Sequence, residues 1–484
     1  MVKNVIPQAP KGHILLTSRT PIWGKLAQPV DIDLMKDEEG AFFLLQRINI
    51  LKQDTPQNSV SDTDYNNAKK ISQIMAGLPL ALEQAGAYID EMGCGLAEYI
   101  DLYQNQQTTL LKWQSNLDSD QTKSVATTWS LSFEQIEQTN PQAADLLRFF
   151  AFLHPDAIPE EIITIGSPHL STNIRSIATN PLELNLAIRD LRRYSLVHRT
   201  PDSQTLSIHR LEQVILKERM NTETQQKWAE RTVKAVNQVF PRVEFNTWVE
   251  CQQYLPHALI CVDLIEQWEM RFAEAARLLN VAGYYLYQRA NYNEAELLLH
   301  KALTTRKELF ETDHPEIAES LNNLAELYRI QAKYLQAVPF CQQALEIRKQ
   351  LWGIDHYEVA LSMNNLARLY QHLGQYYQAE PLYQQALEIR KRTLGLDHPA
   401  IAESLNDLAT LYSRQGKDVK GIALLLEALE IRRRTLGNNH PDVALSLNNL
   451  GITYREQAQY KLAESYHLQA LEIRKQALVL QSHF

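Results

Sequence analysis

The sequence predicts a mainly α-helical protein, in which an α-solenoid of 42-residue helix pairs follows a smaller region of helices and short strands. Three observations predict this fold class. Residue types recur in register every 42 residues through the C-terminal part of the chain, as expected for stacked repeats. Apolar residues within each repeat follow helical spacing. Glycine contributes only 16 of 484 residues, below its usual share of about 7%, which favours helix.

Each repeat contains two amphipathic helices. The recurring columns are His314, His356, His398 and His440; Ala302, Ala344, Ala386, Ala428 and Ala470; Arg306, Arg348, Arg390, Arg432 and Arg474; and Tyr328, Tyr370, Tyr412 and Tyr454. Leu321, Leu324 and Tyr328 share one face of a first helix, called helix A here. Ala337 and Ala344 lie on a second helix, helix B, where small side chains permit close approach to a neighbour.

The histidine column predicts helix caps rather than a metal site. Successive histidines stand one repeat apart, too far to share an ion whose ligands lie within about 2.1 Å. Each is part of a polar turn, such as Asp313-His314-Pro315, and proline is favoured in the first turn of a helix. We therefore expect each helix A to begin at this turn.

The blocks LNNLAELYRIQAKYLQAVPFCQQALEIR and LNNLGITYREQAQYKLAESYHLQALEIR resemble the tetratricopeptide repeat, in the 42-residue form of kinesin light chain. The resemblance covers five helix pairs from about Arg271 to the C-terminus. Three positions depart from the pattern: Tyr357 replaces a proline, and Asp418 and Gly421 replace the tyrosine and alanine of the fourth pair. We expect these departures to weaken packing locally without changing the fold.

Amide side chains recur in the middle of each helix A, although asparagine is a mediocre helix former. The resemblance places this face along a concave groove that takes a peptide or protein partner. Amides there can pair with a peptide backbone, or they can bond a neighbouring helix and only space the repeats; both interpretations remain open. The candidate groove residues are Asn322, Asn323, Glu326, Arg329, Asn364, Asn365, Arg368, Gln371, Asn406, Asp407, Arg414, Asn448, Asn449 and Arg455.

Two motifs mark the N-terminal region. The stretch GHILLTSRTPIW predicts a buried strand, Ile14 to Leu16, that ends at Arg19. The stretch GLPL, beginning at Gly77, predicts the end of one helix and the start of another. Farther along, a helix is expected at 181–193, a hairpin of strands at 196–199 and 205–208, and a helix from Arg210 onward.

Together these motifs resemble the sensor strand, the GLPL motif and the winged helix of bacterial NB-ARC-type ATPases of the STAND class. The resemblance implies that Arg19 is the sensor arginine, that Pro79 packs on the adenine of ADP or ATP, and that His209 holds the ADP-bound state. Each residue also has a structural alternative: an ion pair for Arg19, a helix-start proline for Pro79 and a helix cap for His209.

The sequence lacks the catalytic motifs of such an ATPase. A P-loop requires GxxxxGK[ST], and the chain contains no such string. About a dozen residues precede the sensor strand, too few for the Walker B strand. We therefore expect no enzymatic activity, no catalytic residue and no required cofactor, with ADP or ATP contact implied by resemblance alone.

The predicted domains are a nucleotide-binding remnant at 1–50, a GLPL helical domain at 51–135, a winged-helix domain at 136–221, a TPR-like helical linker at 222–270, and the repeat solenoid at 271–484. The four cysteines lie far apart without metal-ligand spacing, which favours a reducing cytoplasm. No apolar stretch has membrane-spanning length, so no membrane partner is expected.

The leading hypothesis is a scaffold that binds a protein or peptide in the groove of the repeats. The first alternative is a nucleotide-dependent signalling switch whose P-loop half is supplied by another chain. The second is DNA binding by the winged helix, through the basic cluster of Arg189, Arg192, Arg193, His198, Arg199 and Arg210. The net charge of −9 argues against nucleic acid as a partner. Self-association is a further expectation.

Overall fold

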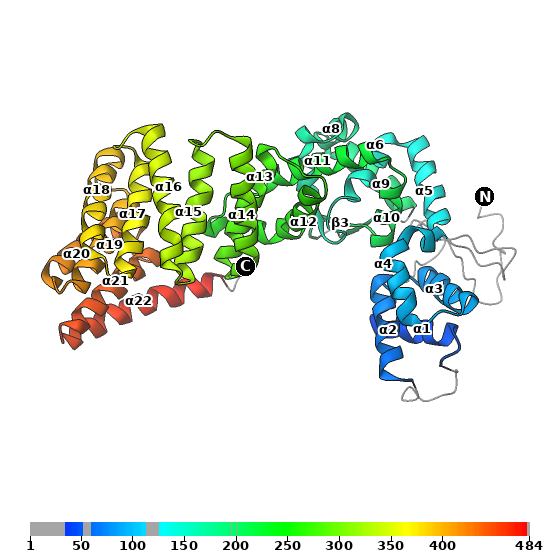
Figure 1. Ribbon diagram of the computed structural model, residues 1–484, viewed down its shortest axis with the longest axis horizontal. Helices are drawn as coiled ribbons and strands as arrows, with labels where there is room; N and C mark the ends of the chain where they lie inside the picture. Colours follow the sequence, from blue (N-terminus) through cyan, green and yellow to red (C-terminus); the bar gives the residue numbers. More distant parts are fainter. Residues whose placement is uncertain (1–33, 52–59, 113–124, 195, 201, 482–484) are drawn as a thin grey trace, which may run out of the picture. The chain divides into compact units, whose positions relative to one another are not determined.

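The computed structural model describes residues 34–51, 60–112, 125–194, 196–200 and 202–481 (Figure 1). Within these ranges the chain is mainly helical, with 22 α-helices and one small sheet. It divides into two compact units, Met1–Met270 and Arg271–Phe484, which are described separately below. None of the helices in the described ranges is long and apolar enough to span a membrane. The strand predicted at 14–16 lies outside the described residues.

The first unit begins with four helices that share one core. They are α1 (Asp37–Arg47), α2 (Asp62–Ile74), α3 (Pro79–Met92) and α4 (Leu96–Lys112). Leu44, Ile71 and Leu82 are fully buried in this core. The GLPL prediction is confirmed at the level of the helices, because α2 ends before the motif and α3 begins at Pro79.

A three-stranded antiparallel sheet and six further helices follow. The helices are α5 (Val125–Thr139), α6 (Pro141–Phe150), α7 (Glu160–Thr164), α8 (Thr172–Ala178), α9 (Pro181–Arg193) and α10 (Arg210–Glu218). The strands β1 (Ile158–Pro159), β2 (His198–Thr200) and β3 (Thr205–Ser207) lie in the order β1-β3-β2. The helices expected at 181–193 and from Arg210 are thus present. The hairpin is also present, but its strands are shorter than the sequence predicts and pair Thr200 with Thr205 next to the turn.

Two longer helices complete the first unit, α11 (Thr222–Val239) and α12 (Trp248–Gln267). Helix α11 begins at an asparagine cap, since the side chain of Asn221 accepts a hydrogen bond from the backbone N–H of Thr224. Trp228 is only 3% exposed, so it is part of the core, as the helical spacing of the apolar residues predicts.

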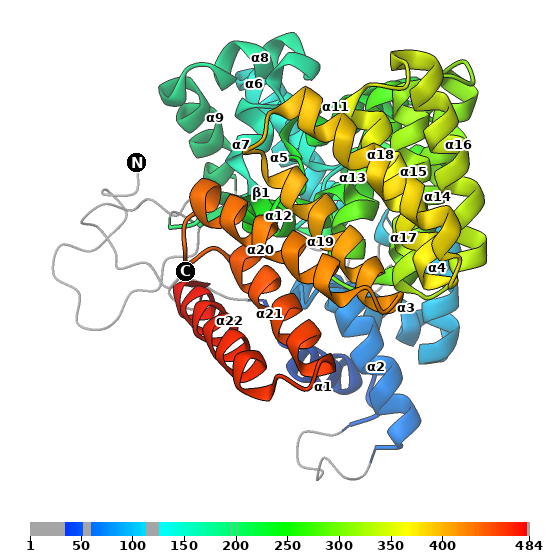
Figure 2. The same cartoon turned by 90° about the vertical axis from the view of Figure 1, so that its left-hand side faces the viewer.

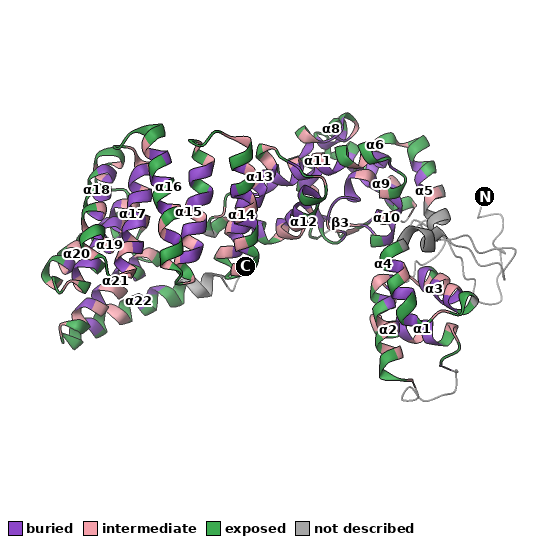
Figure 3. Cartoon of the chain, viewed as in Figure 1, coloured by how far each residue is buried: buried purple, intermediate pink, exposed green. Residues whose placement is uncertain are grey.

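The second unit is a solenoid of five helix pairs (Figures 1 and 2). The A helices are α13 (Ala273–Gln288), α15 (Pro315–Ile330), α17 (Tyr357–His372), α19 (Pro399–Arg414) and α21 (Pro441–Glu456). The B helices are α14 (Tyr292–Leu309), α16 (Tyr334–Trp352), α18 (Tyr376–Leu394), α20 (Asp418–Leu436) and α22 (Tyr460–Gln481). Buried residues gather between successive helices, as Figure 3 shows. This arrangement confirms the predicted fold class.

The histidine column caps the A helices. The Nδ1 atom of His314 accepts a hydrogen bond from the backbone N–H of Glu316 at 3.3 Å. His356, His398 and His440 make the same bond to the residue two positions on, each at 3.2 Å. Among the described residues there is no cluster of side chains that could hold a metal ion. The four hydrogen bonds confirm the predicted capping role.

A buried arginine joins each B helix to the following A helix. Arg390, which is 0% exposed, donates to the carbonyl oxygen of Ala400 at 2.7 Å and to the Ser404 hydroxyl at 2.8 Å. The same bond to a buried serine hydroxyl recurs for Arg306 with Ser320, Arg348 with Ser362, and Arg432 with Ser446, each at 2.7 Å. These charge-assisted bonds fix the spacing between repeats.

The departures from the repeat pattern leave the fold intact. Helix α17 begins at Tyr357 without the usual proline, because His356 still supplies the cap. At Gly421, α20 lies so close to α19 that an added Cβ would stand 3.0 Å from the carbonyl oxygen of Ala409. Asp418 accepts a hydrogen bond from Ser413 at 3.1 Å. Weaker packing of this pair stays a prediction.

Candidate peptide-binding face of the repeats

The candidate groove residues lie on the four A helices α15, α17, α19 and α21, and the surface they form is called the amide face. Helical spacing puts each pair of amide-type residues near the middle of its helix, beside the apolar stripe, with the two members of a pair about 100° apart around the helix axis. Polar side chains from neighbouring A helices meet there, because equivalent positions recur in every repeat.

Hydrogen bonds connect the amides into a ladder that runs from one A helix to the next. Asn365 donates to the side-chain oxygen of Asn322 at 2.7 Å, and Asn449 donates to that of Asn406 at 3.2 Å. Between these two rungs, Asn364 donates to the carboxylate of Asp407 at 2.6 Å. The ladder supports the spacing interpretation of the amides, since each bond joins two neighbouring repeats.

The amides differ in how far they are buried. This difference shows which amides can contact a peptide backbone and which can only space the repeats. Asn364 is 0% exposed and Asn406 is 5% exposed, so neither offers a surface to a partner. Asn448 is partly exposed, and within the described residues its side chain makes no hydrogen bond. Asn322, Asn323 and Asn365 are also partly exposed. Peptide contact is thus open to the second group and not to the first.

The ladder continues through Asn323, which donates to Asn280 of α13 at 3.3 Å. Sequence reasoning missed Asn280, although it precedes Asn322 by one repeat. It also missed the serines whose hydroxyl groups accept hydrogen bonds from the buried arginines, although each serine follows its arginine by 14 residues. Recurrence at this fixed offset is the signal that could have found them.

Charged side chains lie toward the C-terminal ends of the same helices. Arg329 pairs with Glu326 on its own helix, with N–O distances of 2.6 and 2.8 Å. Arg368 of α17 reaches Asp407 of α19 at 2.7 Å and Glu403 at 3.2 Å. The charge of Asp407 raises the pKa of Arg368 well above its usual value, against the effect of burial. Both arginines are therefore held in fixed positions.

Two arginines of the amide face have no such partner. Arg414 and Arg455 are exposed, and no carboxylate of the described residues forms an ion pair with either of them. The charges of Arg329, Arg414 and Arg368 also act on His372, whose pKa is lowered, first by burial and then by these three cations. This end of the amide face therefore presents a positive surface with free donors, suited to carbonyl or carboxylate acceptors.

Gln371 points into the solenoid and not outward. It is 5% exposed, and its side-chain oxygen accepts a hydrogen bond from the hydroxyl of Tyr383 at 2.8 Å. Burial raises the pKa of this hydroxyl well above its usual value, which keeps the tyrosine protonated as a donor. Gln371 therefore joins α17 to α18 inside the solenoid and is not available to a partner.

The residues implied by the ATPase resemblance lie in the first unit. Arg19 lies outside the described residues. Pro79 is the first residue of α3 and is partly exposed. His209 caps α10, since its Nδ1 accepts a hydrogen bond from the N–H of Leu211 at 3.2 Å. The capping alternative for His209 is thus observed, while a nucleotide contact stays a prediction.

His209 also contacts the segment that precedes the GLPL motif. Burial lowers the pKa of His209 to about 4, against a backbone hydrogen bond with Ala76, which acts to raise it. Ala76 and Gly77 form a tight turn with positive φ angles of 50° and 66°. The structure therefore brings His209 and the GLPL turn together, although they are far apart in the sequence.

Comparison with protein-family models gives two matches. The tetratricopeptide repeat model matches residues 274–350, 358–420 and 414–476. A domain of unknown function, DUF7779, matches residues 134–225, which include the sheet and helices α6 to α10. Neither match tests the predicted nucleotide-binding remnant.

A curated relative is a nucleotide-binding leucine-rich repeat (NLR)-like protein of Hyaloscypha variabilis, 31% identical over 269 residues. The match covers 53% of this chain and 26% of the relative, so the chain spans about a quarter of that protein's length. The bacterial source expected from the resemblance stays a prediction.

Among solved structures, the nearly identical TPR-like repeats of a Podosopora anserina protein titled a putative kinesin light chain are 25% identical, with a TM-score of 0.37. They cover 43% of this chain and 99% of their own. BtubC from P. vanneervenii is 23% identical with a TM-score of 0.37, over 53% of this chain and 92% of its own. The helix pairs of residues 274–476 are tetratricopeptide repeats.

Proposed function

We propose that the protein is an interaction scaffold that binds an acidic or extended peptide segment of a partner protein on the amide face. The observation that carries the proposal is the contrast between fixed and free polar groups on that face. Buried amides and paired arginines hold the repeats in register, while Arg414, Arg455 and Asn448 keep unused donors at the surface. Tetratricopeptide repeats are suited to this role, because their stacked helices form extended surfaces.

A random-peptide display library, selected on the purified full chain, tests the proposal. Peptides enriched in Asp and Glu are expected, and the double variant Arg414→Ala, Arg455→Ala should weaken their binding by at least about tenfold, measured by fluorescence anisotropy. The matched control removes two exposed cations from B helices, Lys420→Ala with Arg474→Ala, and should bind as the wild type does. Equal weakening in both double variants would show a general charge effect and would contradict the proposal.

A second candidate function is a nucleotide-dependent switch whose P-loop half is supplied by another chain. The contact between His209 and the Ala76–Gly77 turn favours it, together with the NLR-like relative. Titration of the full chain with fluorescent ADP tests this function. Saturable binding that His209→Ala abolishes would support it, and lack of binding at about 1 mM ADP would leave the scaffold as the working function.

A further inference from the structure

The first unit contains a cavity of about 400 Å³, and neither the residues of the amide face nor His209 and the Ala76–Gly77 turn line it. Its walls come from α5, α6, the end of α10 with the segment that follows it, and the first half of α11; these helices are labelled in Figure 1. Pockets that hold small molecules have volumes of roughly 300 to 1,000 Å³. The cavity is therefore large enough for a small ligand.

Two of the arginines that line the cavity are neutralised by the protein. Arg148 pairs with Glu137 and, at 2.7 Å, with Asp145. Arg219 pairs with Glu134 at 3.2 Å. Both guanidinium groups also lie over the ring of Phe133, with distances of 5.3 and 5.4 Å to its centroid. With two guanidinium groups and three carboxylates, these residues carry a formal charge of −1, so they supply no net positive charge to the cavity.

The third arginine, Arg231, carries an unbalanced charge. Its guanidinium lies over the Trp228 ring, 5.0 Å from the centroid, and it forms no ion pair with a carboxylate of the described residues. Trp228 is 3% exposed and holds the guanidinium against a firm apolar surface. The cavity therefore has one region of positive charge, at α11.

Further donors lie on the same face of α11. Thr224 lines the cavity two helical turns before Arg231, and within the described residues its hydroxyl makes no hydrogen bond. Asn221 also lines the cavity; its side-chain oxygen accepts from the backbone of Thr224, which leaves its NH₂ group as a donor. A guanidinium fork, a hydroxyl and an amide donor together match the oxygens of an anion.

We propose that this cavity is a binding site for a small molecule that carries a doubly charged oxyanion, either a phosphate or a pair of carboxylates. Arg231 binds the anion in a bidentate manner, and Thr224 donates a further hydrogen bond. Arg148 and Arg219, which are paired with carboxylates, keep the cavity polar without attracting a second anion. The site is independent of the amide face.

Isothermal titration calorimetry of the full chain tests the proposal, with pyrophosphate and succinate as separate probes. Saturable binding of at least one probe below about 1 mM is expected, and the probe that binds identifies the oxyanion. Arg231→Gln should weaken binding by at least about tenfold, Arg231→Lys less than this, and Thr224→Val by a smaller factor.

Arg192→Gln is the matched control, because Arg192 is an exposed arginine of α9 outside the cavity. It should bind the probe as the wild type does. Circular dichroism verifies that each variant keeps its helices. The proposal is overturned if neither probe binds the wild type at about 1 mM, or if Arg231→Gln and the wild type bind equally well.

Discussion

At the scale of single residues, the buried arginine column gives the sharpest test of what holds the repeats together. Arg390→Ala removes donors to Ala400 and Ser404 and leaves a cavity, so unfolding of the solenoid should become easier by about 2–4 kcal/mol. Arg474→Ala is the control, since Arg474 belongs to the same column but is exposed, and should cost within about 0.5 kcal/mol. Urea unfolding monitored by circular dichroism measures both, and equal costs would contradict this role.

The amide ladder separates stability from partner binding within one residue type. Asn364→Ala removes a buried bond to Asp407 and should destabilise the solenoid by about 1–3 kcal/mol. Asn448→Ala removes no hydrogen bond that the described residues show, so the melting temperature should stay unchanged while affinity for a selected peptide falls. A loss of stability in Asn448→Ala equal to that in Asn364→Ala would assign the whole column to spacing.

Two buried histidines predict acid lability of the first unit. Burial lowers the pKa values of His209 and His257 to about 4, below the value of 6.5 for an unperturbed histidine. The unfolded state therefore binds more protons between these values. The contribution of each histidine is complete above pH 6.5 and is lost as the pH falls toward 4, at up to about 1.4 kcal/mol per pH unit.

Glu212 has the opposite pH dependence. Burial raises the pKa of its carboxyl group, so its contribution to stability is lost as the pH rises above the pKa of a glutamate in the unfolded state. The variant His257→Gln removes one histidine and keeps Glu212, and it therefore isolates the histidine effect. His257 is 1% exposed in α12. Between pH 6.5 and 5, the wild type should lose more stability in urea unfolding than His257→Gln does. Parallel pH profiles for the two proteins would contradict the prediction.

At the scale of elements, the turn between α2 and α3 depends on a glycine. Gly77 has a φ of 66°, and an added Cβ would stand 2.1 Å from the carbonyl oxygen of Met35. Gly77→Ala should therefore destabilise the first helices by more than about 1 kcal/mol. Gly93→Ala is matched in φ, at 62°, but meets nothing within 4 Å, so thermal melting of the two variants separates the clash from the backbone strain. Equal melting temperatures would rule out the clash.

Helices were predictable from sequence where the local pattern and the packing agree. The 42-residue columns located the five helix pairs, and the histidine caps located the starts of four of the five A helices, because both signals repeat at fixed spacing. The hairpin strands were placed less well, since His198 to Thr200 is too short for period-2 alternation to set its bounds.

The candidate site was predictable only in part. Sequence spacing brought Asn322 and Asn365 to one face, but it could not show that they bond each other, because that contact depends on how neighbouring repeats stack. Sequence spacing also could not reveal the cavity at Arg231, because its walls come from several segments of the first unit. Contacts between distant segments follow from packing and leave no local pattern.

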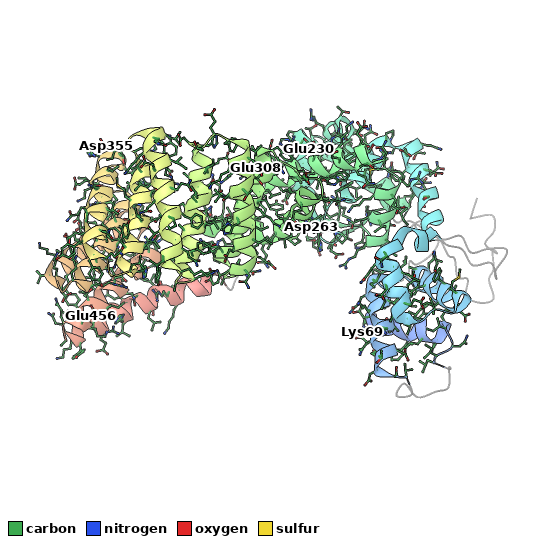
Figure 4. All side chains as sticks on the ribbon, in the orientation of Figure 1. Lys69, Glu230, Asp263, Glu308, Asp355 and Glu456 are labelled. Carbon is green, nitrogen blue, oxygen red and sulfur yellow. The ribbon has the colours of Figure 1, made fainter. Side chains whose placement is uncertain are left out.

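At the scale of the whole molecule, the two units carry different candidate sites. The repeats present the amide face, and the first unit contains the cavity at Arg231 and the contact of His209 with the GLPL turn. Figure 4 shows the side chains of both units. Binding at one site can therefore be measured in variants of the other, with the full chain kept intact.

Hydrogen–deuterium exchange of the full chain, with and without a selected acidic peptide, tests whether the peptide binds on the amide face. A peptide bound on the amide face should slow exchange in α15, α17, α19 and α21, most of all at the ends of α19 and α21 that carry Arg414 and Arg455, and should leave exchange in the B helices and in residues before Arg271 unchanged. Slowed exchange confined to the B helices or to the first unit would contradict this prediction.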